Sequence, residues 1–223
     1  MTLALSPAFG AGGAEPYANA LRRDDDALFL RNASAESPTQ RRLDLAGWTA
    51  DADPVDRALI AQVVGPMLDV GCGPGRLVRA AEAQGIPSLG IDVSAAAVET
   101  ARGLGGTFSQ QTVFDRVPDE GTWRTALLID GNIGIGGDIP ALLTRCAEII
   151  APDGIVVVEL DTDPAHEQRY EAEIVDGSGA SSARFPWAEV GRDALSAMLH
   201  ETPLEITRSW EIGGRSFSAL ARR

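Results

Sequence analysis

Residues 67–78, MLDVGCGPGRLV, bring together residue types suited to holding a nucleotide-like ligand. The apolar run 67–70 has the length of a buried parallel strand, and it breaks into Gly71, Gly73 and Gly75. Because glycine has no Cβ, the backbone there can take positive φ and a ligand can approach it closely. A helix is expected directly after the third glycine, and the free N–H groups at its start would face the ligand. The segment therefore predicts a strand–loop–helix cradle for a cofactor.

A second acidic position supports this interpretation. Asp92 ends another short apolar run, 88–92, close to the roughly 20-residue distance downstream of the first glycine that is typical of a ribose-binding carboxylate. A carboxylate at the carboxyl end of a strand can accept both ribose hydroxyl protons. The alternative is that Asp92 only caps the helix expected over 95–102, for which Ser94 is the predicted N-cap.

The spacing of the glycines decides between cofactors. The dinucleotide fingerprint G-x-G-x-x-G needs a third glycine where this chain has Arg76. The pattern is instead Asp69-x-Gly71-x-Gly73-x-Gly75, which resembles motif I of the class I S-adenosylmethionine (SAM) dependent methyltransferases. SAM carries a sulfonium and an amino group but no pyrophosphate, so an acidic residue beside the loop favours it over NAD(P).

The resemblance implies a role for each matching position. The glycine loop would hold the methionine moiety and the underside of the adenosine, Asp92 the ribose, and Val93 the adenine. The implied cofactor-binding set is Asp69, Gly71, Cys72, Gly73, Gly75, Asp92, Val93, Thr112, Val113, Asp130 and Gly131.

One position departs from the family pattern. An acidic residue after the third strand often meets the adenine amino group in the family, and Thr112 stands there in this chain. Either the Thr112 hydroxyl or the carboxylate of Asp115 would then take that role. Phe114, between them, is interpreted as a core residue.

The loop after the fourth expected strand, 130–138, should face the methyl group, because ligands bind beyond the carboxyl ends of strands in open α/β sheets. It lacks the Asn/Asp-Pro-Pro-aromatic signature of enzymes that methylate amino groups of adenine or glutamine. Asp138 is better explained as a helix N-cap. The candidate acceptor-binding residues are Asn132, Ile133, Trp48 and Trp187, although a lone Trp48 is more often a packing residue.

The loop after the fifth expected strand offers a weak catalytic candidate. His166 could act as a general base for a hydroxyl or phenol acceptor, or have no role as an exposed loop residue. Together with Asp161 and Asp163 it also suggests a weak magnesium site. No general base is required, since proximity alone can drive methyl transfer. No metal is expected, because a D-x-D pair with a nearby histidine is common on protein surfaces.

The elements that must position these residues alternate along the chain. Strands are expected at 67–70, 88–92, 106–110, 125–130, 154–160, 204–211 and 215–221, and helices at 76–84, 95–102, 139–150 and 192–200. Alternation predicts an α/β fold, namely a Rossmann-like, doubly wound, mostly parallel seven-stranded sheet. Gly213-Gly214 predicts that the last two strands form an antiparallel hairpin, again as in the class I methyltransferase core.

The first 60 residues differ in character from the rest. We expect residues 1–60 to form an N-terminal extension with lid-like helices at 16–30 and 55–64, and residues 61–223 to form the SAM-binding core. The Gly- and Ala-rich segment 8–14 is expected to be loosely attached. Residues 176–191 are predicted to be a variable insertion whose Phe185 and Trp187 contact an apolar acceptor.

Composition limits the function further. The 32 acidic and 19 basic residues give a formal charge of −13, which disfavours a nucleic-acid substrate. Every basic residue is arginine, so Schiff-base chemistry on lysine is excluded. The lysine-free, Ala- and Gly-rich composition is typical of a GC-rich bacterial genome. Two cysteines, no basic leader and no apolar run of about 20 residues predict a cytoplasmic protein without a membrane partner.

The function predicted from the sequence is in-line methyl transfer from SAM to a small-molecule acceptor, with S-adenosylhomocysteine (SAH) as product. The sequence is compatible with a homodimer. Two alternatives remain: a methyltransferase-like protein that binds SAM without turnover, and, less favoured, an NAD(P)-binding Rossmann enzyme.

Overall fold

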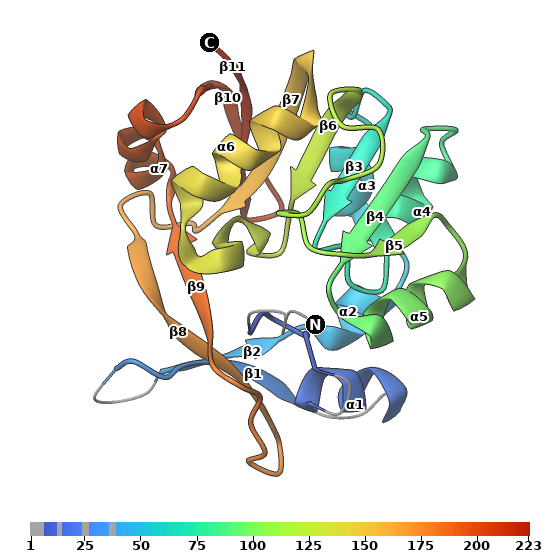
Figure 1. Ribbon diagram of the computed structural model, residues 1–223, viewed down its shortest axis with the longest axis vertical. Coiled ribbons are helices and arrows are strands. Elements are labelled where there is room, and N and C mark those ends of the chain that lie inside the picture. The colour runs from blue at the N-terminus through green and yellow to red at the C-terminus, as the bar shows by residue number, and fades with distance from the viewer. Residues whose placement is uncertain (1–6, 13–14, 24–26, 36–38) are drawn as a thin grey trace.

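The computed structural model describes residues 7–12, 15–23, 27–35 and 39–223. Within them, seven strands form the main sheet in the order β10-β11-β7-β6-β3-β4-β5 (Figure 1). Neighbouring strands from β5 to β7 run parallel, whereas β11 is antiparallel to both β7 and β10. The predicted fold class is confirmed. The strands are β3 (Met67–Val70), β4 (Ser88–Asp92), β5 (Phe108–Gln110), β6 (Trp123–Leu128), β7 (Ile150–Leu160), β10 (Leu204–Ile212) and β11 (Arg215–Arg222).

Helices cover both faces of this sheet. On one face α3 (Pro54–Ile60), α4 (Arg76–Glu82) and α5 (Ala95–Leu104) pack in a cluster that includes Met67. On the other face α6 (Ile139–Ile149) and α7 (Arg192–Met198) pack in a cluster that includes Leu68. Neighbouring residues of β3 point to opposite faces and both are buried, which is why the strand is apolar on both sides.

Local sequence signals explain where the helices begin. Ser94 accepts a hydrogen bond from the N–H of Ala97 at the start of α5, and Asp138 accepts one from Ala141 at the start of α6. Asp53 caps α3 in a capping box. Short 3₁₀ turns, η1 (Asn132–Gly137) and η2 (Leu199–Glu201), flank α6 and α7 respectively.

A second sheet, which the sequence did not predict, lies beyond the carboxyl ends of the parallel strands (Figure 1). We call it the cap sheet. It is antiparallel throughout, in the order β2-β1-β8-β9, and consists of β1 (Leu28–Asn32), β2 (Gln40–Leu43), β8 (Glu167–Asp176) and β9 (Phe185–Val190). The N-terminal segment thus pairs with strands that lie about 140 residues later in the chain, since Arg31 faces Glu173.

Three expectations for these segments are corrected. The helix expected over 16–30 is α1 (Pro16–Arg23); Leu28 and Phe29 belong to β1, and residues 24–26 of that range lie outside the described residues. The segment expected as an insertion, 176–191, contains β9. The expected helix over 55–64 is α3, which ends at Ile60, and α2 (Leu45–Thr49) precedes it.

The cap sheet turns an apolar face toward the main sheet. Its buried side chains form one cluster with Tyr17 of α1 and Ala97 of α5; from the cap sheet these are Leu28, Leu30, Leu43, Tyr170, Ala172, Ile174, Phe185 and Trp187. Burial of this face holds the two sheets together around the ends of β3, β4 and β6. In the described part of the chain, no helix has the length and apolarity needed to cross a bilayer.

Candidate functional site

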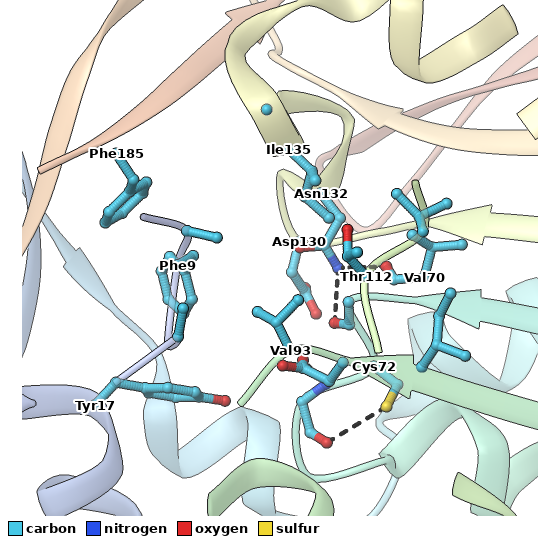
Figure 2. Close-up of a pocket in the computed structure, with 18 of the residues that line it drawn as sticks. Phe9, Tyr17, Val70, Cys72, Val93, Thr112, Asp130, Asn132, Ile135 and Phe185 are labelled. Carbon is cyan, nitrogen blue, oxygen red and sulfur yellow. Dashed lines mark hydrogen bonds between the residues drawn. The ribbon is translucent and has the colours of Figure 1, made fainter. Parts of the chain in front are cut away.

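A cavity of about 500 Å³ lies between the carboxyl ends of the parallel strands and the cap sheet. Loops of the main sheet form one wall, and aromatic side chains of the N-terminal region and β9 form the other. Figure 2 shows Phe9, Tyr17 and Phe185 facing a wall made by Val70, Cys72, Val93, Thr112, Asp130 and Asn132.

Asn132 anchors the glycine loop from the neighbouring loop after β6. Its Nδ2 donates to the carbonyl oxygens of Val70 at 3.0 Å and Gly71 at 2.9 Å (Figure 2). Gly71 has φ +73°, and a Cβ there would lie 2.7 Å from Asn132 Nδ2. This position therefore requires glycine for both its backbone angle and its space. Asn132, expected to contact the acceptor, also lies on the wall, but its amide positions the glycine loop.

The third glycine begins α4 and does not line the cavity. Gly75 is the left-handed N-cap of that helix, with φ +83°, and a Cβ there would lie 2.3 Å from Cζ of Phe108. Close packing of α4 against β5 explains this glycine. The structure thus shows a role for Gly75 in shaping the loop, and its contact with the cofactor stays a prediction.

Asp92 ties the glycine loop to the start of α5. Its Oδ2 accepts from the N–H of Gly73 at 2.9 Å and its Oδ1 from Ser94 at 2.8 Å. Burial raises the pKa of Asp92 to about 6, while these backbone hydrogen bonds oppose the rise. Each oxygen keeps a lone pair for a further donor, and the side chain lines the cavity.

The wall beyond Asp92 includes two valines. Val93 and Val113 line the cavity together with Thr112, whose Oγ1 accepts from the N–H of Phe114 at 3.3 Å. Phe114 is 46 % exposed at the rim, so its interpretation as a core residue is corrected. Asp115 is not on the wall, so of the two residues considered for the adenine amino group only Thr112 lines the cavity, next to Gln111.

A network of charged side chains supports the floor of the cavity. Arg76 pairs with Asp56 and Asp130, each at 2.7 Å. Arg215 pairs with Asp56 at 2.9 Å, with Asp130 at 3.3 Å and with Glu159 at 2.7 Å. Arg76, which excluded the dinucleotide fingerprint, thus has a structural function: a glycine in its place would leave two carboxylates without this partner.

The network fixes the geometry of Asp130. Glu159 accepts from the N–H of Asp130 at 2.7 Å, and Asp130 has φ +59°, a strained angle that aspartate tolerates better than most residues. Burial raises the pKa of Asp130 and Arg76 opposes the rise. Asp69 lies behind this network, buried within β3 and away from the wall; burial raises its pKa to about 7, and Arg76 opposes the rise.

Five aromatic rings close the cavity on the cap side, and we call Phe9, Tyr17, Trp48, Phe185 and Trp187 the aromatic cluster. Phe9 is central: its ring centroid lies 5.2 Å from Tyr17, 5.8 Å from Phe185 and from Trp187, and 6.2 Å from Trp48. The described part of the segment expected to be loose, residues 8–12, therefore packs across the site. Burial, and next the charge of Asp92, raise the pKa of Tyr17 well above its usual range, so its phenol stays protonated.

Several polar side chains on and beside the cap sheet border the aromatic cluster. Arg41 Nη2 lies 3.4 Å from Glu189 Oε1, and the same oxygen accepts from the Tyr170 hydroxyl at 3.0 Å. His166 Nε2 lies 3.5 Å from Glu189 Oε2. Arg41 lines the cavity, whereas His166 does not. The weak general-base candidate is thus outside the wall.

The two acidic residues that suggested a magnesium site have other partners. Asp161 and Asp163 accept from backbone N–H groups two residues further along the chain, as in Asx turns. Among the described residues, no group of three or more His, Cys, Asp or Glu side chains is arranged to hold a metal ion.

The structure brings most predicted residues to one cavity. Those on its wall are Trp48, Gly71, Cys72, Gly73, Asp92, Val93, Thr112, Val113, Asp130, Asn132 and Trp187; those that are not are Asp69, Gly75, Gly131, Ile133 and His166. Ile133 is 2 % exposed and packs in the core beside α6 instead of facing an acceptor. Sequence reasoning missed Phe9 and Arg41; a single aromatic ring in a Gly- and Ala-rich segment was the available signal for Phe9.

Comparison with solved structures gives the same architecture. A methyltransferase from Bacteroides fragilis, solved with SAH, superposes with TM-score 0.74 at 20 % identity over 98 % of both chains. The CcbJ methyltransferase from Streptomyces caelestis gives TM-score 0.60 at 13 % identity, over 80 % of this chain and 93 % of that one. A Burkholderia thailandensis 1,6-didemethyltoxoflavin-N1-methyltransferase gives 0.56 at 18 % identity over 81 % of both.

No curated protein sequence matches the chain significantly. Residues 39–207, most of the chain, match the model of the family described as "Methyltransferase domain". That range includes the glycine loop, Asp92 and the loop after β6, and the mostly parallel seven-stranded sheet with its antiparallel C-terminal hairpin is the one that the resemblance implies. The chain therefore belongs to the methyltransferase-domain family and is a class I SAM-dependent methyltransferase.

Proposed function

We propose that the cavity binds SAM along the glycine loop and a small-molecule methyl acceptor beside the aromatic cluster. The observation that carries the proposal is the shared cavity, with the loop and Asp92 on one wall and aromatic rings on the other. A relative points the same way: the Burkholderia thailandensis enzyme was solved with bound 1,6-didemethyltoxoflavin and SAH.

The residues present fit the cofactor. A Cβ at Gly73 would meet no neighbour nearer than the Tyr17 hydroxyl at 3.4 Å, so the loop leaves an open cradle there. The free lone pairs of Asp92 suit two ribose hydroxyls. Val93 and Val113 on the wall offer apolar contacts to the adenine ring, and the Thr112 hydroxyl offers one polar contact to its edge.

When bound, SAM supplies an electrophilic methyl group on a sulfonium, which becomes a neutral thioether on transfer. The chain's own contribution is alignment and exclusion of water. The network around Arg76 and Arg215 holds Asp130 and its loop rigid against the glycine loop, and the aromatic cluster keeps the acceptor side dry. A water-poor cleft favours the reaction because positive charge disperses in the transition state.

The first test is calorimetric titration of the purified protein with SAM, SAH and NADH, each alone. We expect saturable binding of SAM and SAH, no NADH signal, and loss of binding in Asp92→Ala. Asp115→Ala, which removes a carboxylate off the wall, is the matched control and should bind normally. NADH binding without SAM binding would overturn the proposal.

A second experiment separates turnover from binding alone. Transfer of labelled methyl from SAM is measured on small phenols, acids and amines, with tRNA alongside. Turnover on a small molecule is expected. Turnover on tRNA alone would contradict the proposed acceptor class, and SAM binding without any turnover would favour a non-catalytic SAM-binding protein.

A further inference from the structure

Arg41 differs from the other charged groups on the cavity wall. Arg76 and Asp130 are locked together at 2.7 Å, and Asp92 accepts two backbone hydrogen bonds. Arg41 instead lies at the edge of the cap sheet with a half-exposed side chain, and its pairing distance to Glu189 is 3.4 Å. Its guanidinium is therefore the more loosely held cation on this wall.

The position of Arg41 is that of a ligand contact on the acceptor side. Arg41 Nη2 and Trp187 Cζ2 each lie 3.9 Å from the point that a Cβ on Gly131 would occupy. Gly131 itself does not line the cavity, but Arg41 and Trp187 do, so the guanidinium and the indole approach the same point beside the Gly131 backbone. A ligand lying against Trp187 would bring its edge to the guanidinium.

Glu189 can release Arg41 without losing its own partners. The Tyr170 hydroxyl donates to it at 3.0 Å, and His166 Nε2 lies 3.5 Å away. Burial, followed by the charge of Glu189 and the hydrogen bond to it, raises the pKa of Tyr170, so this phenol remains a donor. A turn of the Arg41 side chain toward the cavity therefore leaves no bare carboxylate.

We propose that the methyl acceptor is a planar aromatic molecule with an anionic substituent, whose ring contacts the aromatic cluster and whose anion is bound by Arg41. The inference rests on the proposed function and adds the acceptor class to it. In a chain with a net charge of −13, such an anion needs a local cation, and Arg41 provides one beside an aromatic wall.

The test compares two isosteric probes, naphthalene-2-carboxylate and naphthalene-2-carboxamide, by calorimetric titration of the full chain saturated with SAH at low salt. Wild-type protein should bind the carboxylate about tenfold more tightly than the amide. Arg41→Gln should reduce this preference to about twofold or less. Arg42→Gln removes the same charge from the other face of β2, because neighbouring strand residues alternate, and should keep the preference.

A variant of the competing carboxylate gives a change of opposite sign. Glu189→Gln keeps an acceptor for Tyr170 but removes the charge that competes for Arg41, so it should bind the carboxylate more tightly than wild type. Equal binding of the two probes by wild type, binding of neither, or an undiminished preference in Arg41→Gln would overturn the inference. Failure of SAH itself to bind would instead contradict the proposed function.

Discussion

Asp92 gives the site a predictable pH dependence. Its pKa of about 6 means that much of it is protonated near pH 5.5 and most is ionised at pH 7.5. Ribose hydroxyls donate to the ionised carboxylate, so SAH should bind more tightly when Asp92 is ionised.

SAH affinity should therefore rise as the pH increases through 6 and level off above about 7, with a proton released on binding at the lower pH. Calorimetry from pH 5 to 8, in buffers of different ionisation enthalpy, measures both effects. Asp92→Asn cannot titrate and should lose much of this rise. The same slope in the variant would assign the pH dependence to another group, such as Asp69, whose pKa burial raises to about 7.

Alanine substitutions at Gly75 and Gly85 distinguish the cost of a steric clash from the cost of a left-handed backbone angle. Both have positive φ, +83° and +76°, but a Cβ would meet Phe108 at 2.3 Å in the first and nothing within 4 Å in the second. Gly85→Ala should lower the free energy of unfolding by about 1 kcal/mol, from the left-handed angle alone. Gly75→Ala should lower it by at least about 2 kcal/mol more, because α4 must move from β5. Urea unfolding measures the difference, and equal losses would contradict the packing explanation.

Among the elements, the charged network joins α3, α4, β7, β11 and the loop after β6 at one point. Arg215 comes from the start of β11, so the C-terminal hairpin helps to hold the loop that carries Asp130. Removing one partner of such a network leaves carboxylates underpaired in a largely buried place.

Arg215→Gln should therefore lower the free energy of unfolding by about 2 kcal/mol or more. Arg208→Gln is the control: Arg208 lies exposed over the Trp210 ring on the same hairpin and should contribute about 0.5–1 kcal/mol. Urea unfolding measures the loss of free energy of unfolding in both variants. Comparable losses would show that the network contributes little more to stability than an exposed contact between arginine and tryptophan.

Across the whole molecule, the cap sheet contacts η1, the turn that follows β6 of the main sheet, at Gly134. A Cβ there would lie 2.1 Å from the carbonyl oxygen of Ala188 and 2.8 Å from Cε2 of Trp187. Because this glycine has no positive φ, the requirement is purely one of space between η1 and β9.

Gly134→Ala should push β9 away, shift tryptophan emission to longer wavelength and lower the free energy of unfolding by about 1–3 kcal/mol. Gly103→Ala in α5, where no atom lies within 4 Å, should instead raise it by up to about 1 kcal/mol. Fluorescence-monitored unfolding tests both. An unchanged emission spectrum in Gly134→Ala would mean that η1 and β9 are not in close contact there.

The main sheet could be predicted because its signals are local. β3 and β4 begin and end at the expected residues, since short apolar runs bounded by glycine or an acid define buried parallel strands. The glycine loop is a local motif as well, and the positions of Gly71, Gly73 and Asp92 follow from the strand ends that carry them. Because these signals are local, about a dozen residues were enough to indicate the family resemblance.

The cap sheet and its residues required the folded chain. β2 reads QRRL, a polar segment that becomes a strand only by pairing with β1, and β1 in turn pairs with β8 far along the chain. Arg76 gained its role from Asp56 and Asp130, which no spacing links to it. Phe9 and Arg41 likewise lie on the cavity wall only because segments distant in the sequence come together in the fold. Local patterns fix which segments become strands and turns, whereas contacts between distant segments depend on a surface that exists only after folding.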